Sequence, residues 1–368
     1  MFKKAVTSLL LFNLTSEGVA AFSPDLDIGG TTKIGLEYNV VPTKWASNPQ
    51  YQDGFDIISN SSNFHIGASQ ALDQDSTAYF KYVLRIDTAM GTMNKSTQVK
   101  SGTNYAYVGY TYKNFDIQTG AMKSIPYKYV GKYDDVAFIE GYHSYSANRK
   151  IQKAVLATYQ IGALQLGTDI QATATGVADG QQGDQGTSSI FSYAVGAQYA
   201  KDNVEIGVAY NAYTSGAVGN SNTSQSEQLQ SLNNSGQIPP YWGIGGAYTF
   251  DKATGNKLFG QFSYLSRGNN SNQHGTNSSL SNGDNVGYYQ DSSYDIGIKL
   301  YNTILRYSSG YLDSESNSLL VNHQTEVAKN LFLRTEVNFP SVLAVDSFNS
   351  RHRTIAINSY AVDVKYVF

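Results

Sequence analysis

Histidine, cysteine and phosphate-binding glycine loops are the features that would give this chain catalytic or cofactor chemistry. The 368 residues include five histidines and no cysteine. No two histidines lie four residues apart, so the His-x-x-x-His zinc signature is absent. Without cysteine, a thiolate metal site and a disulfide scaffold are both excluded. The glycine-rich stretch from Gly180 to Gly186 lacks the lysine and the strand-to-helix context of a phosphate loop. Asp179 and Asp184 there could hold a weak surface cation, but a hydrated loop is the simpler interpretation.

Hydrolytic chemistry is equally poorly supported. A Ser/His/Asp triad is assembled in space, so spacing along the chain does not test it. The chain has no Gly-x-Ser-x-Gly nucleophile elbow, however. We therefore expect a protein that is not an enzyme, uses no cofactor and holds no metal. With 26 Lys and Arg against 29 Asp and Glu, the chain also has no basic footprint for nucleic acid.

Charged residues instead recur at alternate positions of short apolar segments. The clearest segment runs from Ala78 to Asp87, where aromatic and aliphatic residues alternate with Lys81, Arg85 and Asp87. Successive side chains of a strand point to opposite faces, so this pattern predicts a strand with one apolar and one polar face. About sixteen such segments follow Phe22. Their polar faces carry Gly, Ser, Gln, Asp and Lys, which could not form the core of a β-sandwich.

The connections and the composition favour a membrane barrel. Links of a few residues, such as Lys113-Asn114 and Asn302-Thr303, alternate with long polar stretches, such as residues 213–240 and 267–291. Short turns and long loops alternate in this way in outer-membrane barrels, which have lipid outside and water inside. No run of 18 apolar residues offers a spanning helix. We predict an all-β, transmembrane antiparallel β-barrel of about 16 strands, wide enough for an aqueous channel.

Both ends of the chain carry export signals. Residues 1–21 read as a signal peptide, with Lys3 and Lys4 before an apolar stretch and small residues near Ala21; a frayed helix is the alternative. Residues 22–368 then form one barrel domain. The last strand alternates apolar and aromatic residues and ends on phenylalanine. This pattern resembles the assembly signal of bacterial outer-membrane barrels, although Asp363 stands where that signal often has glycine. Its residues are Tyr360, Val362, Val364, Tyr366 and Phe368.

Together these segments resemble the general diffusion porins of Gram-negative outer membranes. The stretches 62–68 and 78–82 look like their second and third strands, and 104–110 and 115–120 like their fourth and fifth. The resemblance implies a homotrimer, contacts with outer-membrane lipid and lipopolysaccharide, insertion by the barrel-assembly machinery, and passage of small hydrophilic solutes and ions. One difference is Ala121, where the family usually has an arginine.

The resemblance also implies a constriction. The third long loop, from about Met122 to Lys150, would fold inward and set acidic groups against basic groups of the wall, creating a transverse field. The acidic candidates are Asp134, Asp135 and Glu140. The wall candidates, taken from strand parity, are Lys33, Lys81, Arg85 and Lys365. Further basic residues that could face the pore are Lys123, Arg149 and Lys153.

Three functions remain open at this point. The preferred one is a porin for passive diffusion, and a mild cation preference follows from the net negative charge that remains after removal of the signal peptide. The second is a substrate-specific channel for a sugar or an organic anion, with Tyr79, Tyr105 and Tyr107 starting an aromatic run along the lumen. The third is a non-conducting adhesin or structural barrel, because fold does not decide function.

Overall fold

The structure is a computed structural model, and it describes eleven stretches of the chain. They are residues 24–40, 54–58, 62–87, 92–93, 103–133, 150–172, 190–213, 240–265, 292–309, 317–345 and 354–368. The predicted signal peptide, residues 1–21, lies outside them. Among the described residues, no helix is both long and apolar enough to cross a bilayer.

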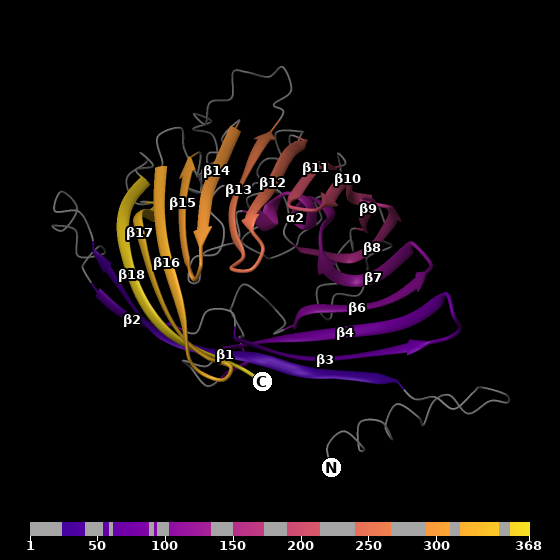
Figure 1. Cartoon of the computed structure of the whole chain (residues 1–368), viewed down its shortest axis with the longest axis horizontal. Helices are drawn as coiled ribbons and strands as arrows, with labels where there is room; N and C mark the ends of the chain where they lie inside the picture. The colour runs from indigo at the N-terminus through magenta and orange to yellow at the C-terminus, as the bar shows by residue number, and fades with distance from the viewer. Residues whose placement is uncertain are drawn as a thin grey trace, which may run out of the picture.

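The described residues are almost entirely β-structure (Figure 1). The principal strands are β1 (Asp25–Val40), β3 (Ser62–Ala71), β4 (Ser76–Asp87), β6 (Thr103–Tyr112), β7 (Phe115–Lys123), β8 (Lys150–Ile161), β9 (Leu164–Ala172), β10 (Ile190–Lys201), β11 (Val204–Tyr213), β12 (Tyr241–Asp251), β13 (Asn256–Leu265), β14 (Ser292–Leu300), β15 (Thr303–Ser309), β16 (Asn317–Ala328), β17 (Leu331–Val345) and β18 (Thr354–Val367). Two shorter strands are β2 (Gly54–Ile58) and β5 (Thr92–Met93).

Each strand pairs antiparallel with its neighbours, and the sheet closes on itself. The register from Thr31 opposite Val367 to Val40 opposite Asn358 joins β1 to β18. On its other side, the first half of β1 pairs with β3 and the second half pairs with β2. The strands β2 and β3 therefore occupy one strand position of the barrel, end to end beside β1. The short strand β5 pairs only with the end of β4. The described strands therefore form the predicted closed, antiparallel barrel of sixteen strands.

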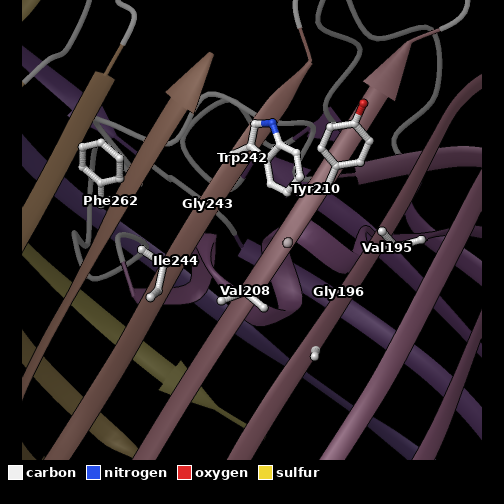
Figure 2. Close-up of a pocket in the computed structure, with 10 residues that line it drawn as sticks. Val195, Gly196, Val208, Tyr210, Trp242, Gly243, Ile244 and Phe262 are labelled. Atoms are coloured by element: carbon white, nitrogen blue, oxygen red, sulfur yellow. The ribbon is translucent and has the colours of Figure 1, made fainter. Parts of the chain in front are cut away.

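The two faces of the wall differ as the alternation predicts. On β10, the side chain of Val195 is 48% exposed, whereas that of its neighbour Ala194 is 0% exposed. Figure 2 shows the outer side chains of β10 to β13, including Tyr210 and Trp242, whose ring centroids lie 4.4 Å apart. They border a shallow apolar depression of about 500 Å³. The outer face of the barrel is thus apolar and aromatic, which is the reverse of a water-soluble protein.

One rim of the barrel consists of tight turns. Two residues separate β6 from β7, β8 from β9, β10 from β11, β14 from β15 and β16 from β17. Each of these turns contains a residue with a left-handed backbone, such as Lys113 (φ 51°), Gly162 (φ 57°) and Asp202 (φ 55°). Left-handed turn residues match the twist of paired strands and allow two-residue hairpins. We call this rim the short-turn end.

Glycines of β1 make the closing seam possible. The backbone N–H of Gly30 donates to the carbonyl of Phe368 at 3.0 Å, and the N–H of Phe368 donates to the carbonyl of Gly30 at 3.2 Å. A Cβ added to Gly30 would lie 2.5 Å from the carbonyl oxygen of Asn63 and 2.7 Å from the ring of Phe368. The final aromatic residue therefore lies against a backbone surface that only glycine leaves open.

Replacing Gly30 tests this seam. We expect Gly30→Val to lower the free energy of unfolding by about 2 kcal/mol, because overpacking forces the strand or the ring to move. The measurement is the denaturant midpoint of the refolded barrel. Thr32→Val, on the same exposed face of β1, serves as the control and should leave the midpoint unchanged. Equal midpoints for the Gly30 variant and the wild type would contradict the role given to the glycine.

Candidate functional site

The inner surface of the barrel is the candidate site, and a short internal segment lies on part of it. After β7, the chain forms α2 (Ile125–Tyr129) and the 3-10 turn η1 (Gly131–Tyr133). The Ser124 hydroxyl caps α2 by accepting the N–H of Tyr127 at 3.2 Å, and Pro126 occupies its first turn. The segment contacts β9 to β13 and lies inside the curve of the sheet in Figure 1.

Small residues on the inner faces of β9 to β12 create the space for this segment. A Cβ added to Gly207 would collide with the backbone carbonyl of Tyr129. One added to Gly245 would lie 2.6 Å from the ring of Tyr133, and one added to Gly196 would lie 2.8 Å from the ring of Tyr129. At these glycines the backbone of the wall therefore lies directly against the backbone and the aromatic rings of the internal segment. Larger inner residues at these positions would push the segment into the lumen.

A buried carboxylate holds the start of α2. Asp169, on the inner face of β9, is 1% exposed, and its Oδ2 accepts the backbone N–H of Ile125 at 2.6 Å. The side chains of Met122, Ile125 and Tyr129 pack around this bond in one buried cluster with residues of β8, β10 and β11. Burial lowers the pKa of the nearby Lys128, because desolvation disfavours its ammonium form, while the charges of Asp116 and Asp169 act in the opposite direction.

The predicted basic wall residues of β4 occupy the inner face. Lys81 forms an ion pair with Asp27 at 3.4 Å, and His65 lies 3.1 Å from the same carboxylate. These three residues come from β1, β3 and β4, so the contact crosses the width of three strands. Arg85 is exposed and shares the face of Lys81, four residues farther along β4.

The other predicted wall lysines meet at the closing seam. Lys33 of β1 lies directly opposite Lys365 of β18 in the strand register. The Lys365 ammonium also lies 5.5 Å from the centroid of the Phe332 ring. At the end of β7, the Lys123 ammonium lies 4.8 Å from the centroid of the Tyr127 ring, beside the internal segment. Lys153 is exposed, has a left-handed backbone (φ 51°) and lies at an irregularity in the pairing of β7 with β8.

The remaining predicted residues cannot be placed. Asp134, Asp135, Glu140 and Arg149 lie outside the described residues, as does most of the loop to which they belong. The start of that loop is the internal segment described above, whereas the predicted constriction and its transverse field stay predictions. The assembly-signal residues all have exposed side chains, from 38% for Tyr360 to 50% for Phe368; their part in assembly also stays a prediction.

Sequence reasoning missed the polar groups that pair with each other on the wall. Arg334 of β17 and Asp363 of β18 lie opposite each other, are nearly inaccessible to solvent, and form a bidentate ion pair. The pair explains why a carboxylate rather than glycine stands at position 363, with Gly35 on the other side of it. Alternation assigns these residues to the polar face, but only the register between strands brings the two charges together.

Two of the three tyrosines considered for an aromatic run, Tyr79 and Tyr107, are engaged with the wall and with the internal segment. The Tyr79 hydroxyl donates to Asp116 Oδ1 at 2.5 Å and accepts from the Gln118 amide at 2.9 Å. Its ring meets the Tyr107 ring edge-on at a centroid distance of 6.4 Å. Tyr107 in turn packs against the cluster below α2. Tyr79 and Tyr107 therefore support the internal segment, and Tyr105, which belongs to the same strand as Tyr107, has an interaction of its own.

Asp169 provides a direct test of how the internal segment is held. We expect Asp169→Ala to lower the free energy of unfolding by about 1–3 kcal/mol, because the buried N–H of Ile125 loses its acceptor. Asp169→Asn retains an acceptor oxygen and should lose less. Trypsin cleavage after Lys128 or Lys132 reports release of α2, and only the alanine variant should be cut faster than the wild type. Identical stability and cleavage in all three proteins would contradict the tether.

Comparison with solved structures identifies the fold. No protein-family model matches the chain, and no curated protein matches it. Among solved structures, the anion-selective porin from Comamonas acidovorans is similar with a TM-score of 0.62 and 11% sequence identity, over 94% of this chain and all of that one. A mutant of the Rh. blastica porin is similar with a TM-score of 0.59 and 14% identity, over the same shares of the two chains. The chain therefore has the fold of the bacterial porins.

Proposed function

We propose that the protein is an outer-membrane porin, which provides a water-filled channel for passive diffusion of small hydrophilic solutes and ions. The observation that carries the proposal is the two-sided wall. Its outward side chains are apolar and exposed, as on Val195 and Val208, while its inward ones include Asp169, Arg334 and Lys81. An apolar exterior is stable in lipid, and a polar interior is stable in water.

The size of the barrel supports a channel rather than a solid structural element. Eight strands leave space only for side chains, whereas sixteen to eighteen strands leave an aqueous path. In this chain, the internal segment lies on the inner face of β9 to β13, so it covers one side of the wall. The strands from β14 round to β4 form the opposite side, which carries Lys81, Arg85 and Lys33.

The proposal extends to the setting of the barrel. The short-turn end faces the periplasm and the long connections face the outside, as in outer-membrane barrels generally. The partners are outer-membrane lipid and lipopolysaccharide, the barrel-assembly machinery that reads the last strand, and two further copies in a homotrimer. The similarity to porin structures, one of which is named as anion-selective, supports the outer-membrane location.

Neither alternative is favoured by a particular contact. A substrate-specific sugar channel would use aromatic faces that are free to stack on the solute, but the rings of Tyr79 and Tyr107 pack against each other and against the wall. A non-conducting adhesin would function through its long connections, which lie outside the described residues.

Ion current decides whether the barrel conducts. We expect the purified, unheated protein to give large ohmic current steps in a planar lipid bilayer, because ions cross an aqueous pore without a conformational cycle. Closures in groups of three at high voltage would support the trimer. The same preparation after thermal unfolding is the control and should give no steps. Folded, membrane-inserted protein without steps would contradict the porin function and favour the structural or adhesive alternative.

A further inference from the structure

Two lysines lie side by side on the lumen face at the short-turn end. Lys257 is the second residue of β13, Lys299 is the penultimate residue of β14, and the two are direct partners in the strand register. Both are partly buried, and they share a face with Thr249 of β12 rather than with the exposed, outward-facing Leu258 and Leu300. Like charges directly opposite each other on one face of a sheet are destabilising.

A third ammonium group approaches the pair from the internal segment. Lys132 belongs to η1, which contacts β12 and β13. It forms an ion pair with Glu205 of β11, whose side chain also accepts a hydrogen bond from the Gln198 amide. The charges of Lys299, Glu205 and Lys132 all act on Lys257. Among the described residues, Lys132, Lys257 and Lys299 thus share this corner of the lumen with Glu205, and the nearby turn adds one cation and one carboxylate, Lys201 and Asp202.

The charges at this corner do not balance. Glu205 is already paired with Lys132, and within the described part of the chain neither Lys257 nor Lys299 has an ion pair of its own. Lys257 and Glu205 border a polar pocket of about 290 Å³, which extends to the turn at Lys201 and Asp202. Lys299 lies beside this pocket as the strand partner of Lys257, and Lys132 lies beside it as the ion-pair partner of Glu205. A volume of this size holds several water molecules at about 30 Å³ each, or a partly hydrated small anion.

We propose that Lys257 and Lys299, with Lys132 beside them, form a binding site for small divalent oxyanions at the short-turn mouth of the channel. The chemistry follows from the donors. Each ammonium group offers three N–H donors and no acceptor, so two neighbouring lysines match an anion with several charged oxygens. A divalent oxyanion would also offset the net charge of the group. The proposal deepens the channel function, because the anion would reach the site through the lumen.

Sulfate is the probe for this site, since it stays divalent over the neutral range. We expect the purified, folded barrel in detergent to bind sulfate saturably in equilibrium dialysis at low ionic strength. Lys257→Gln and Lys299→Gln should each weaken binding about tenfold, the change expected for loss of one charge-assisted hydrogen bond. Lys257→Arg should retain binding. Lys329→Gln, which removes one exposed lysine from a turn at the same rim, is the matched control and should bind like the wild type.

Thermal unfolding gives a second readout that does not depend on dialysis. Sulfate should raise the unfolding temperature of the wild type and of the Lys329 variant, but not that of the Lys257/Lys299 double variant, because ligands stabilise the state that binds them. Without sulfate, the double variant should be at least as stable as the wild type, since removing like charges relieves repulsion. Wild-type protein that binds no sulfate, or a double variant that binds as tightly, would overturn the site.

The outcomes also separate this site from the channel function. Dialysis is performed without a membrane, so it does not require conduction. A barrel that conducts ions in a bilayer but binds no sulfate would overturn the site and leave the porin function intact. A barrel that binds sulfate through these lysines but conducts nothing would support the site and overturn the porin function.

Discussion

Each of the sixteen principal strands in the described part of the chain depends on backbone hydrogen bonds to two neighbours. An open sheet would leave the N–H and C=O groups of β1 and β18 unpaired, and in hydrocarbon each unpaired group costs several kcal/mol. Pairing of β1 with β18 removes both edges. Once the ring is closed, the two-residue period of a strand assigns every side chain to lipid or to lumen, and a shift of one residue in register would exchange the two sets. Closure thus sets which residues can line a channel.

Glycine residues at a few positions of the wall let aromatic residues pack closely against the backbone. At the seam, Gly30 leaves room for the ring of Phe368, and in the opposite wall Gly207 and Gly245 leave room for the internal segment. These positions lie far apart along the chain, yet each lets a backbone come close to an aromatic residue. The internal segment is then held by the buried carboxylate of Asp169, by the apolar cluster around Met122, Ile125 and Tyr129, and by the ion pair between Lys132 and Glu205. Lumen shape therefore depends on small residues in the wall as much as on the loop itself.

Local pattern made much of this fold predictable. Alternation along β4 assigned Lys81 and Arg85 to the polar face of the strand, and the alternation of short and long links indicated the closed barrel. Pairwise contacts were beyond reach, because they depend on the register between strands. Three contacts illustrate this: the opposition of Lys257 and Lys299, the Arg334–Asp363 ion pair, and the hydrogen bond from Ile125 to Asp169. In each of them the two partners are 29 to 44 residues apart along the chain. The sequence shows the polar face of each strand but not which charges meet on it.

In this barrel, alternate residues of one strand face water and lipid, and the absence of native cysteine makes that arrangement directly testable. Single cysteines can be placed along β4 at Lys81, Tyr82, Leu84 and Arg85. Each folded variant is then inserted in lipid bilayers and treated with a water-soluble, membrane-impermeant thiol reagent. We expect Lys81→Cys and Arg85→Cys to react, and Tyr82→Cys and Leu84→Cys to resist the reagent but to show quenching by lipid-borne labels. Equal reactivity at all four positions, or the reverse pattern, would contradict a barrel with a water-filled interior.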